Sequence, residues 1–159
     1  MSRKIIFNLL FLFSSTISFG QKTKSIFIEF AGSGGLGSIN YEKCFSLKEK
    51  IAFTWRVGLS AIPVDRNNGN AIVFPLMINS LIGKSKNKLE LGIGQGISIT
   101  TKGNFFSLTT AAIGYRRQNP DKRFFYRITY TPLISYIVDL QVQHWFGVSI
   151  CYNFKIKQR

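Results

Sequence analysis

The chain has 159 residues, of which 45% are apolar and 14% aromatic, and its formal net charge is +14. This length suits one domain and argues against two. A basic chain that binds nucleic acid needs a cytoplasmic address and basic residues clustered on one structured face. The first twenty residues indicate export instead, so we do not expect nucleic acid as a partner.

Residues 1–20 have the pattern of a cleaved signal peptide. Arg3 and Lys4 precede a mostly apolar core, and Ser18-Phe19-Gly20 places small residues at the two positions that a signal peptidase reads. The alternative is a membrane anchor, but a broken apolar core of about fifteen residues falls short of the ~20 that span a bilayer. We expect residues 21–159 to form the mature domain, and loss of the two basic residues lowers the charge from +14 to about +12.

The mature sequence contains eight segments in which large apolar residues alternate with small or polar ones. A period of two predicts β-strands. The segments are residues 25–32, 36–45, 51–59, 71–82, 88–99, 105–116, 123–133 and 143–154. Since an exported apolar chain without a helical span must bury its apolar residues or show them to lipid, the pattern predicts either a soluble barrel or a membrane barrel.

In chain order, turns rich in Gly, Ser and Lys at 32–35 and 46–50 separate the first three segments. The third segment, 51–59, alternates most cleanly, because every odd-numbered residue is large and apolar. Residues 61–70 are expected to form a polar loop. Pro75 then interrupts the fourth strand, because proline lacks a ladder donor and belongs at strand edges or bulges.

Three glycines, Gly92, Gly94 and Gly96, share one face of the fifth segment. Their spacing resembles a phosphate-binding loop only superficially, because they lie inside an alternating strand that no helix follows. We expect them to face a narrow lumen and to leave room there for long arginine side chains.

The last segment, 143–154, has an aromatic and apolar face that ends in Phe154, as in the closing strand of a transmembrane barrel. We expect Tyr152 and Phe154 to form the signal that the outer-membrane assembly machinery recognises. An even strand number places both termini on the periplasmic side. The prediction is an all-β fold, an eight-stranded antiparallel transmembrane up-and-down β-barrel that is a monomer in a Gram-negative outer membrane.

Charge favours this barrel over a soluble up-and-down barrel of the lipocalin kind, which faces its apolar residues inward around a ligand. The faces opposite the large apolar residues carry three acids and three bases in an otherwise strongly basic chain: Glu29, Glu42, Glu90, Arg56, Arg116 and Arg127. A neutral set suits a low-dielectric lumen, since breaking a buried ion pair costs ~3–5 kcal/mol. We expect these six residues to pair and to fill the lumen.

Several short motifs in order along the mature chain resemble the small outer-membrane β-barrel proteins of the Bacteroidota. They are Asn40-Tyr-Glu-Lys43, Phe74-Pro75 with Asn79 and Gly83-Lys84, Leu89-Glu-Leu-Gly92, Gly114-Tyr-Arg116, Arg127 with Thr131-Pro132, and residues 147–154. The resemblance implies an outer-membrane location and an eight-stranded or similar barrel, and it implies no established activity. Residues 155–159 depart from the family, because many such barrels stop at the terminal aromatic residue.

His144 is the only histidine, and some small outer-membrane barrels are lipid-A-modifying enzymes that use a His with a Ser and a carboxylate. The alternation points His144 at lipid, which favours a place in an interfacial aromatic girdle. One His and two Cys do not make a metal-ligand set. We therefore expect no catalytic residue, no cofactor and no metal.

Cys44 and Cys151 share the inward face near the periplasmic ends of their strands, in a compartment where a disulfide can persist. The first strand is expected to lie between them. Two ladder spacings of ~4.8 Å exceed the Cα separation of about 7 Å that a disulfide allows, so a bridge needs stagger or bending.

The lysines at 22, 24, 48, 50, 84, 86, 88, 122, 155 and 157 gather on the predicted periplasmic rim. They can bind anionic headgroups or periplasmic polymers, or they can simply be solvated turn residues. We expect outer-membrane lipids as partners and a structural or surface-binding role. The alternatives are a lipid-modifying enzyme, a narrow pore and a soluble exported ligand-binding barrel.

Overall fold

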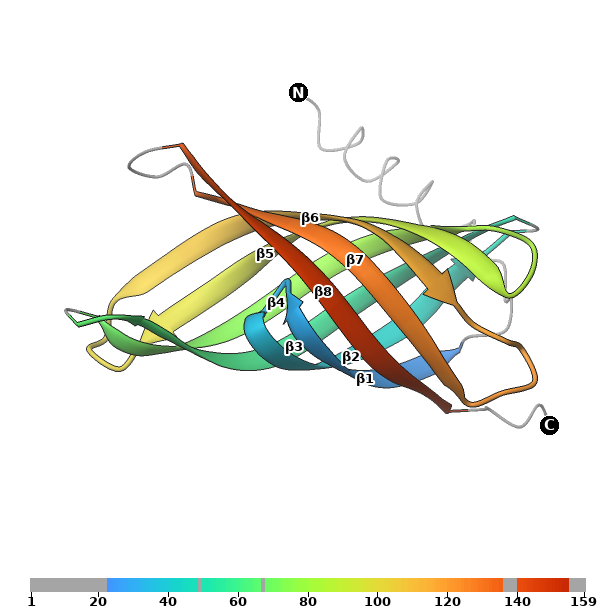
Figure 1. Ribbon diagram of the computed structural model, residues 1–159, viewed down its shortest axis with the longest axis horizontal. Helices are drawn as coiled ribbons and strands as arrows, with labels where there is room; N and C mark the ends of the chain where they lie inside the picture. The colour runs from blue at the N-terminus through green and yellow to red at the C-terminus, as the bar shows by residue number, and fades with distance from the viewer. Residues whose placement is uncertain (1–22, 49, 67, 136–139, 155–159) are drawn as a thin grey trace, which may run out of the picture.

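The computed structural model describes residues 23–48, 50–66, 68–135 and 140–154, which form a closed antiparallel barrel (Figure 1). The predicted signal peptide and residues 155–159 lie outside the described residues. The strands are β1 (Lys24–Gly32), β2 (Gly35–Leu47), β3 (Ile51–Asp65), β4 (Gly69–Ile82), β5 (Asn87–Thr100), β6 (Phe105–Arg117), β7 (Phe124–Ser135) and β8 (Gln141–Phe154). In this part of the chain no helix is long and apolar enough to cross a membrane.

The all-β fold and the number of strands are confirmed. Each strand pairs with the next, and β8 closes the barrel on β1 from Lys24↔Phe154 to Phe30↔Val148. We call the end that holds Lys24 and Phe154 the terminal end of the barrel and the opposite end the loop end. The closing role predicted for the last segment is therefore correct.

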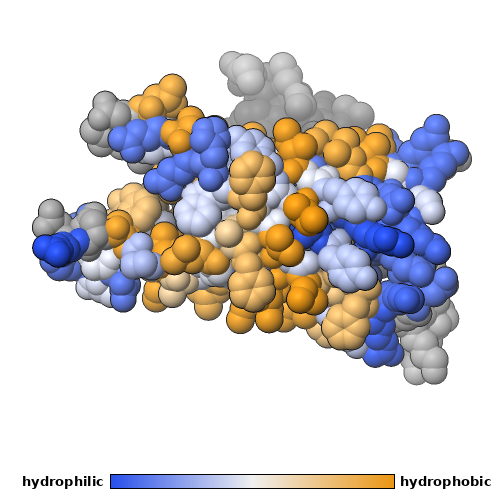
Figure 2. Space-filling view, viewed as in Figure 1, coloured by the Kyte–Doolittle hydropathy of each residue, from blue (hydrophilic) through white to orange (hydrophobic). Residues whose placement is uncertain are grey.

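The barrel is apolar outside and polar inside. Ile28, Ile78 and Ile93 point outward and are 50%, 57% and 65% exposed, whereas Glu29 and Glu90 point inward and are 1% and 0% exposed. Figure 2 shows hydrophobic side chains across the middle of the visible face and hydrophilic ones toward both ends. A soluble ligand-carrying barrel has the opposite arrangement, and a transmembrane barrel has this one.

The predicted loop over residues 61–70 is wrong, because β3 continues to Asp65 and β4 starts at Gly69. Pro63 does not end β3. It lies beyond Ser60, where β3 stops pairing with β2, and at a register shift in the ladder to β4. A missing N–H is tolerated at such an edge or bulge.

Pro75 also interrupts less than expected, because β4 runs through it without a bulge. Only the ladder to β3 has a gap, opposite Gly58 and Leu59, and the register is the same on both sides of that gap. Gly58 makes room for the proline ring, since a Cβ at Gly58 would lie 2.8 Å from Pro75 Cγ. Near the loop end, β7 and β8 each extend two residues further than the predicted segments.

The β1–β2 hairpin is short and turns inward. Gly32 pairs with Gly35, whose φ of 83° favours glycine, and the turn residues Ser33 and Gly34 are buried. Figure 1 shows this hairpin ending near the middle of the barrel, whereas the other hairpins reach the loop end. The tip of the hairpin thereby lies across the lumen.

Candidate functional site in the lumen

Six charged side chains from six strands meet inside the barrel, between the hairpin tip and the terminal end. Each is at most 3% exposed. They are Glu29 of β1, Glu42 of β2, Arg56 of β3, Glu90 of β5, Arg116 of β6 and Arg127 of β7. These are the residues that the alternation placed on inward faces, and we call them the lumen charge network.

Glu90 lies at the centre of the network. Arg56 forms a hydrogen-bonded ion pair with its Oε1, and Arg127 Nη1 donates to the same oxygen over 2.9 Å. Arg116 Nε lies 3.5 Å from the other oxygen, Oε2. One buried carboxylate is thus surrounded by all three guanidinium groups.

The other two carboxylates balance the charge that Glu90 leaves over. Arg116 Nη2 donates to Glu42 Oε1 over 2.6 Å, and Arg127 Nη2 donates to Glu29 Oε1 over 2.7 Å. Arg56 is close to both carboxylates, at 3.8 Å from Glu42 Oε2 and 4.0 Å from Glu29 Oε1. Three positive and three negative groups therefore form one connected and neutral set, as burial at low dielectric requires.

Two inward phenylalanines hold the guanidinium groups from the side, a role that the sequence pattern did not indicate. The Phe27 ring lies 4.2 Å from Arg127 Cζ and 5.0 Å from Arg56 Cζ, and the Phe125 ring lies 4.8 Å from Arg116 Cζ. A cation over a ring face is attracted by the ring quadrupole. The available signal was an aromatic residue on the same strand face as an inward charge, Phe27 with Glu29 and Phe125 with Arg127.

The hairpin tip covers the network on the side of the loop end. Ser33 Oγ donates to Glu29 Oε2 over 2.9 Å, and Ser38 Oγ lies 3.4 Å from the same oxygen. Gly32 has no room for a side chain, because its Cβ would lie 2.5 Å from Glu29 Cδ. The Ser33–Glu29 hydrogen bond joins residues four positions apart through a turn, and strand alternation cannot predict such a contact.

The predicted role of the three inward glycines needs a correction. A Cβ at Gly92 would lie 2.1 Å from Asn79 Oδ1, and one at Gly94 would lie 2.5 Å from Met77 Cγ. These two glycines therefore accommodate the side chains of β4 rather than arginines. Gly96 has no such close neighbour, since its Cβ would lie 3.7 Å from the nearest atoms.

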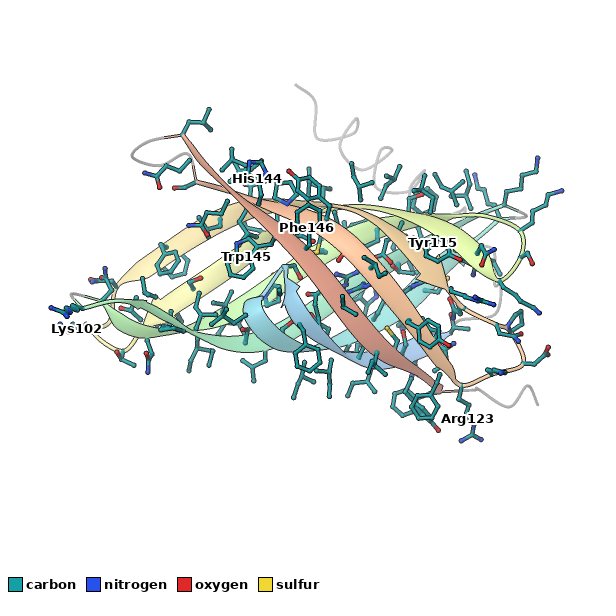
Figure 3. The ribbon with its side chains drawn as sticks, in the orientation of Figure 1. Lys102, Tyr115, Arg123, His144, Trp145 and Phe146 are labelled. Atoms are coloured by element: carbon teal, nitrogen blue, oxygen red, sulfur yellow. The ribbon has the colours of Figure 1, made fainter. Side chains whose placement is uncertain are left out.

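His144 lies on the outer side of β8, as Figure 3 shows, and Trp145 lies on the other side of the strand. Its Nδ1 is 2.6 Å from Tyr130 Oη, and the two rings stack with centroids 5.9 Å apart. Ser149, the closest serine along the strand, is buried in the lumen beside Arg127. His144 is thus separated from the buried serine and carboxylates by the barrel wall.

Cys44 and Cys151 are both free and buried. Cys44 packs with Ala52 and Leu81, whereas Cys151 packs with Phe27 and Phe125, so the two thiols belong to different clusters. Within the described residues, no group of three or more His, Cys, Asp or Glu side chains could hold a metal ion.

Basic residues crowd the terminal end of the barrel. Figure 3 places Arg123 there and Lys102 at the opposite end, and Figure 2 shows hydrophilic side chains over the terminal end. Of the predicted rim lysines, those within the described residues lie near the strand ends or in the connections 83–86 and 118–123. Lys22, Lys155 and Lys157 lie outside the described residues.

No family model matches this chain, and no curated protein matches it either. The solved structures that resemble the fold include two bacterial outer-membrane barrels. The N-terminal β-barrel domain of Pseudomonas aeruginosa OprF has a TM-score of 0.58 at 10% identity, and the match covers 84% of this chain and 98% of that one. The Yersinia pestis outer membrane protein Ail, in a phospholipid bilayer nanodisc, has a TM-score of 0.56 at 11% identity and coverages of 84% and 99%. At these identities the likeness concerns the fold alone.

Proposed function

We propose that this protein is an integral outer-membrane β-barrel with a lumen closed by its own side chains, serving a structural or surface-binding role and not catalysis. The observation that carries the proposal is the reversed polarity of the barrel. Apolar residues cover the outside, and a neutral network of six buried charges fills the inside. An apolar outer surface around a polar lumen suits a protein surrounded by lipid, and it is unfavourable for a protein whose outer surface faces water.

The location and orientation belong to the same proposal. Residues 1–20 direct export, the outer-membrane assembly machinery inserts the mature chain as a monomer, and the terminal end faces the periplasm. The fold shared with two bacterial outer-membrane barrels supports this placement. The motif resemblance to small Bacteroidota barrels supports a source in that group. Lipids of the outer membrane are then the immediate partners.

The position of His144 supports the choice of a non-catalytic role. A lipid-modifying triad needs its histidine within hydrogen-bond reach of a nucleophile or carboxylate. Here the imidazole bonds to Tyr130 on the outer face, next to Phe146, whose ring lies 5.1 Å from that of Tyr130. We assign His144 to an interfacial aromatic girdle.

Cell fractionation and gel mobility test the proposal. The mature protein should fractionate with outer membranes and should migrate faster on a detergent gel before boiling than after it, because the folded barrel resists the detergent. A processed chain starting at Gln21 should be found by N-terminal sequencing. Recovery of the protein in the soluble periplasmic fraction would instead support the ligand-carrying barrel.

A further inference from the structure

The lumen changes character on the loop-end side of the hairpin tip. A cavity of about 310 Å³ lies there, lined mainly by apolar side chains, and Lys, Arg, Asp and Glu are absent from the described residues that line it. Its apolar lining includes Leu36, Val73, Phe106, Leu108, Leu133 and Trp145. This is unusual for a membrane barrel, whose interior is ordinarily polar.

The hairpin tip separates this cavity from the lumen charge network. Ser60 Oγ of β3 lies 2.6 Å from the carbonyl oxygens of both Gly34 and Gly37, with its one proton to donate between them, and so fastens the tip to the barrel wall. Ser33, which also lines the cavity, donates its hydroxyl to Glu29. The tip therefore forms the floor of the cavity. It separates the mainly apolar space on the loop-end side from the charged side chains on the terminal-end side.

The wall of the cavity is incomplete between β3 and β8. Among pairings of described residues, β1 reaches β8 only as far as Val148, and residues 141–147 of β8 pair only with β7. On the other side, β2 pairs with β3 only up to Ser60. Figure 1 shows the short hairpin on the terminal-end side of these unpaired parts of β3 and β8, and Figure 2 shows a recess there between the two lobes of the loop end.

The border of this side opening is apolar. Phe30 and Phe146 point outward beside it and are 58% and 69% exposed, and Leu36 is 56% exposed at the hairpin tip. Because unpaired strand edges are not found in the hydrocarbon core, the free edge of β8 places the opening at the membrane interface. A hydrocarbon chain entering there meets mainly apolar surface, interrupted by Ser33, Ser98 and Gln143, while its headgroup stays at the interface.

We propose that the cavity binds one hydrocarbon chain of a membrane lipid, which enters through the opening between β3 and β8. An apolar cavity gains little from water, which needs two to four polar partners, and readily takes up an apolar guest. The volume is at the lower end of the range for small-molecule pockets, about 300–1,000 Å³, which suits a single chain rather than a whole lipid. This inference rests on the proposed membrane location.

The two tryptophans of the chain provide a direct test with an internal control. Trp145 lines the cavity, whereas Trp55 lies on the outer face of β3 beside Tyr41, with ring centroids 5.5 Å apart. The Trp55→Phe variant reports on the cavity, and the Trp145→Phe variant reports on the outer surface. Each is reconstituted in nanodiscs of phospholipid brominated on the acyl chain, and its fluorescence is compared with that in unbrominated discs.

We expect the brominated lipid to quench Trp145 by a fraction similar to that for Trp55. Gly96→Leu should remove the quenching of Trp145, because Gly96 lines the cavity and has no atom within 3.7 Å of its added Cβ. Ala111→Leu is the control. Ala111 lies on the outer face of β6, between the buried Thr110 and Ala112 and away from β3 and β8, so a larger side chain there should leave the quenching unchanged.

The outcomes separate this inference from the proposed function. Three outcomes would each overturn the cavity assignment while leaving the membrane location intact. The brominated lipid could quench Trp55 but not Trp145, or it could quench Trp145 equally in the Gly96→Leu variant. Aqueous acrylamide could also quench Trp145 strongly. Absence of quenching at Trp55 would overturn the membrane location itself. A further arm adds brominated free fatty acid to unbrominated discs. If the fatty acid quenches Trp145 and the brominated phospholipid does not, the cavity is still a hydrocarbon site, but its ligand is a free fatty acid and not a membrane phospholipid.

Discussion

Each arginine of the lumen charge network is shared between carboxylates from different strands, so losing one leaves the buried network with one more carboxylate than it has arginines. Arg56 is hydrogen bonded to Glu90 and lies near Glu29 and Glu42. Arg56→Ala should lower the free energy of unfolding by ~3–5 kcal/mol, measured by urea titration of the protein in lipid vesicles. Arg117→Ala, at an exposed arginine of the rim, is the control and should change it by less than about 0.5 kcal/mol. Equal stability of the two variants would mean that water reaches the lumen.

Substitution of His144 should have little effect on folding, unlike that of Arg56, because the contacts of His144 are at the outer surface. His144→Phe keeps the aromatic stack on Tyr130 and removes one exposed hydrogen bond. We expect normal outer-membrane levels and normal heat-dependent gel mobility, together with an unchanged profile of lipid A by mass spectrometry. A lipid A species lost in this variant, while the barrel stays folded, would establish an enzymatic role.

At the residue scale, alternation was sufficient to find all six lumen charges but could not tell which ones meet. The partners Arg56 and Glu90 are 34 positions apart, and Arg127 and Glu29 are 98 apart. Their contacts depend on how far each side chain reaches across the lumen, which strand periodicity does not specify. The same limit explains the glycines, since only the packing of β4 against β5 shows that Gly92 and Gly94 face Asn79 and Met77.

Among the elements, β8 carries the closure of the barrel. Phe154 pairs with Lys24 and Tyr152 with Ile26, and Phe124, Tyr152 and Phe154 form a chain of ring contacts at 5.2 and 5.4 Å. Deletion of residues 152–154 should abolish assembly, seen as loss of the protein from outer membranes, because it removes both the ladder and the aromatic end. The exchange Tyr152→Phe with Phe154→Tyr keeps both features and should accumulate normally. Normal levels of the truncated chain would contradict the closing role.

The gap in the β3–β4 ladder depends on a glycine opposite a proline. A Cβ at Gly58 would lie 2.2 Å from Asn40 Oδ1 and 2.8 Å from Pro75 Cγ. Gly58→Ala should therefore lower the free energy of unfolding by about 1–3 kcal/mol, because neither neighbour can move freely in the packed lumen. Gly96→Ala, at an inward glycine with open space, should cause no loss under the same titration. Tolerance of Gly58→Ala would show that the Pro75 side of the lumen is loosely packed.

At the element scale, periodicity predicted the number, order and direction of the strands, and it failed where a strand lacks a neighbour. Pro63 indicated a loop because proline is excluded from paired positions, yet β3 is unpaired with β2 beyond Ser60 and tolerates it. Periodicity also did not predict that the tip of the short β1–β2 hairpin covers the lumen charge network. The inward bend of the hairpin depends on the bond of Ser33 to Glu29, four positions earlier, and on the bond of Ser60 to Gly34, 26 positions away.

The whole molecule combines two closures of one lumen, the charge network and the hairpin tip above it. Eight strands enclose an interior just wide enough for side chains to fill, and here three arginines and three glutamates fill it on the terminal-end side of the tip, at no more than 3% exposure. The described residues that line the cavity beyond the tip carry no charge to attract an ion. The purified protein should therefore give no stable unitary conductance in planar bilayers, in which a porin reconstituted by the same procedure conducts. A steady conductance in the unmodified protein would mean that the six charges line an open, hydrated path instead of filling it, and Arg56→Ala would then change the current far more than the stability.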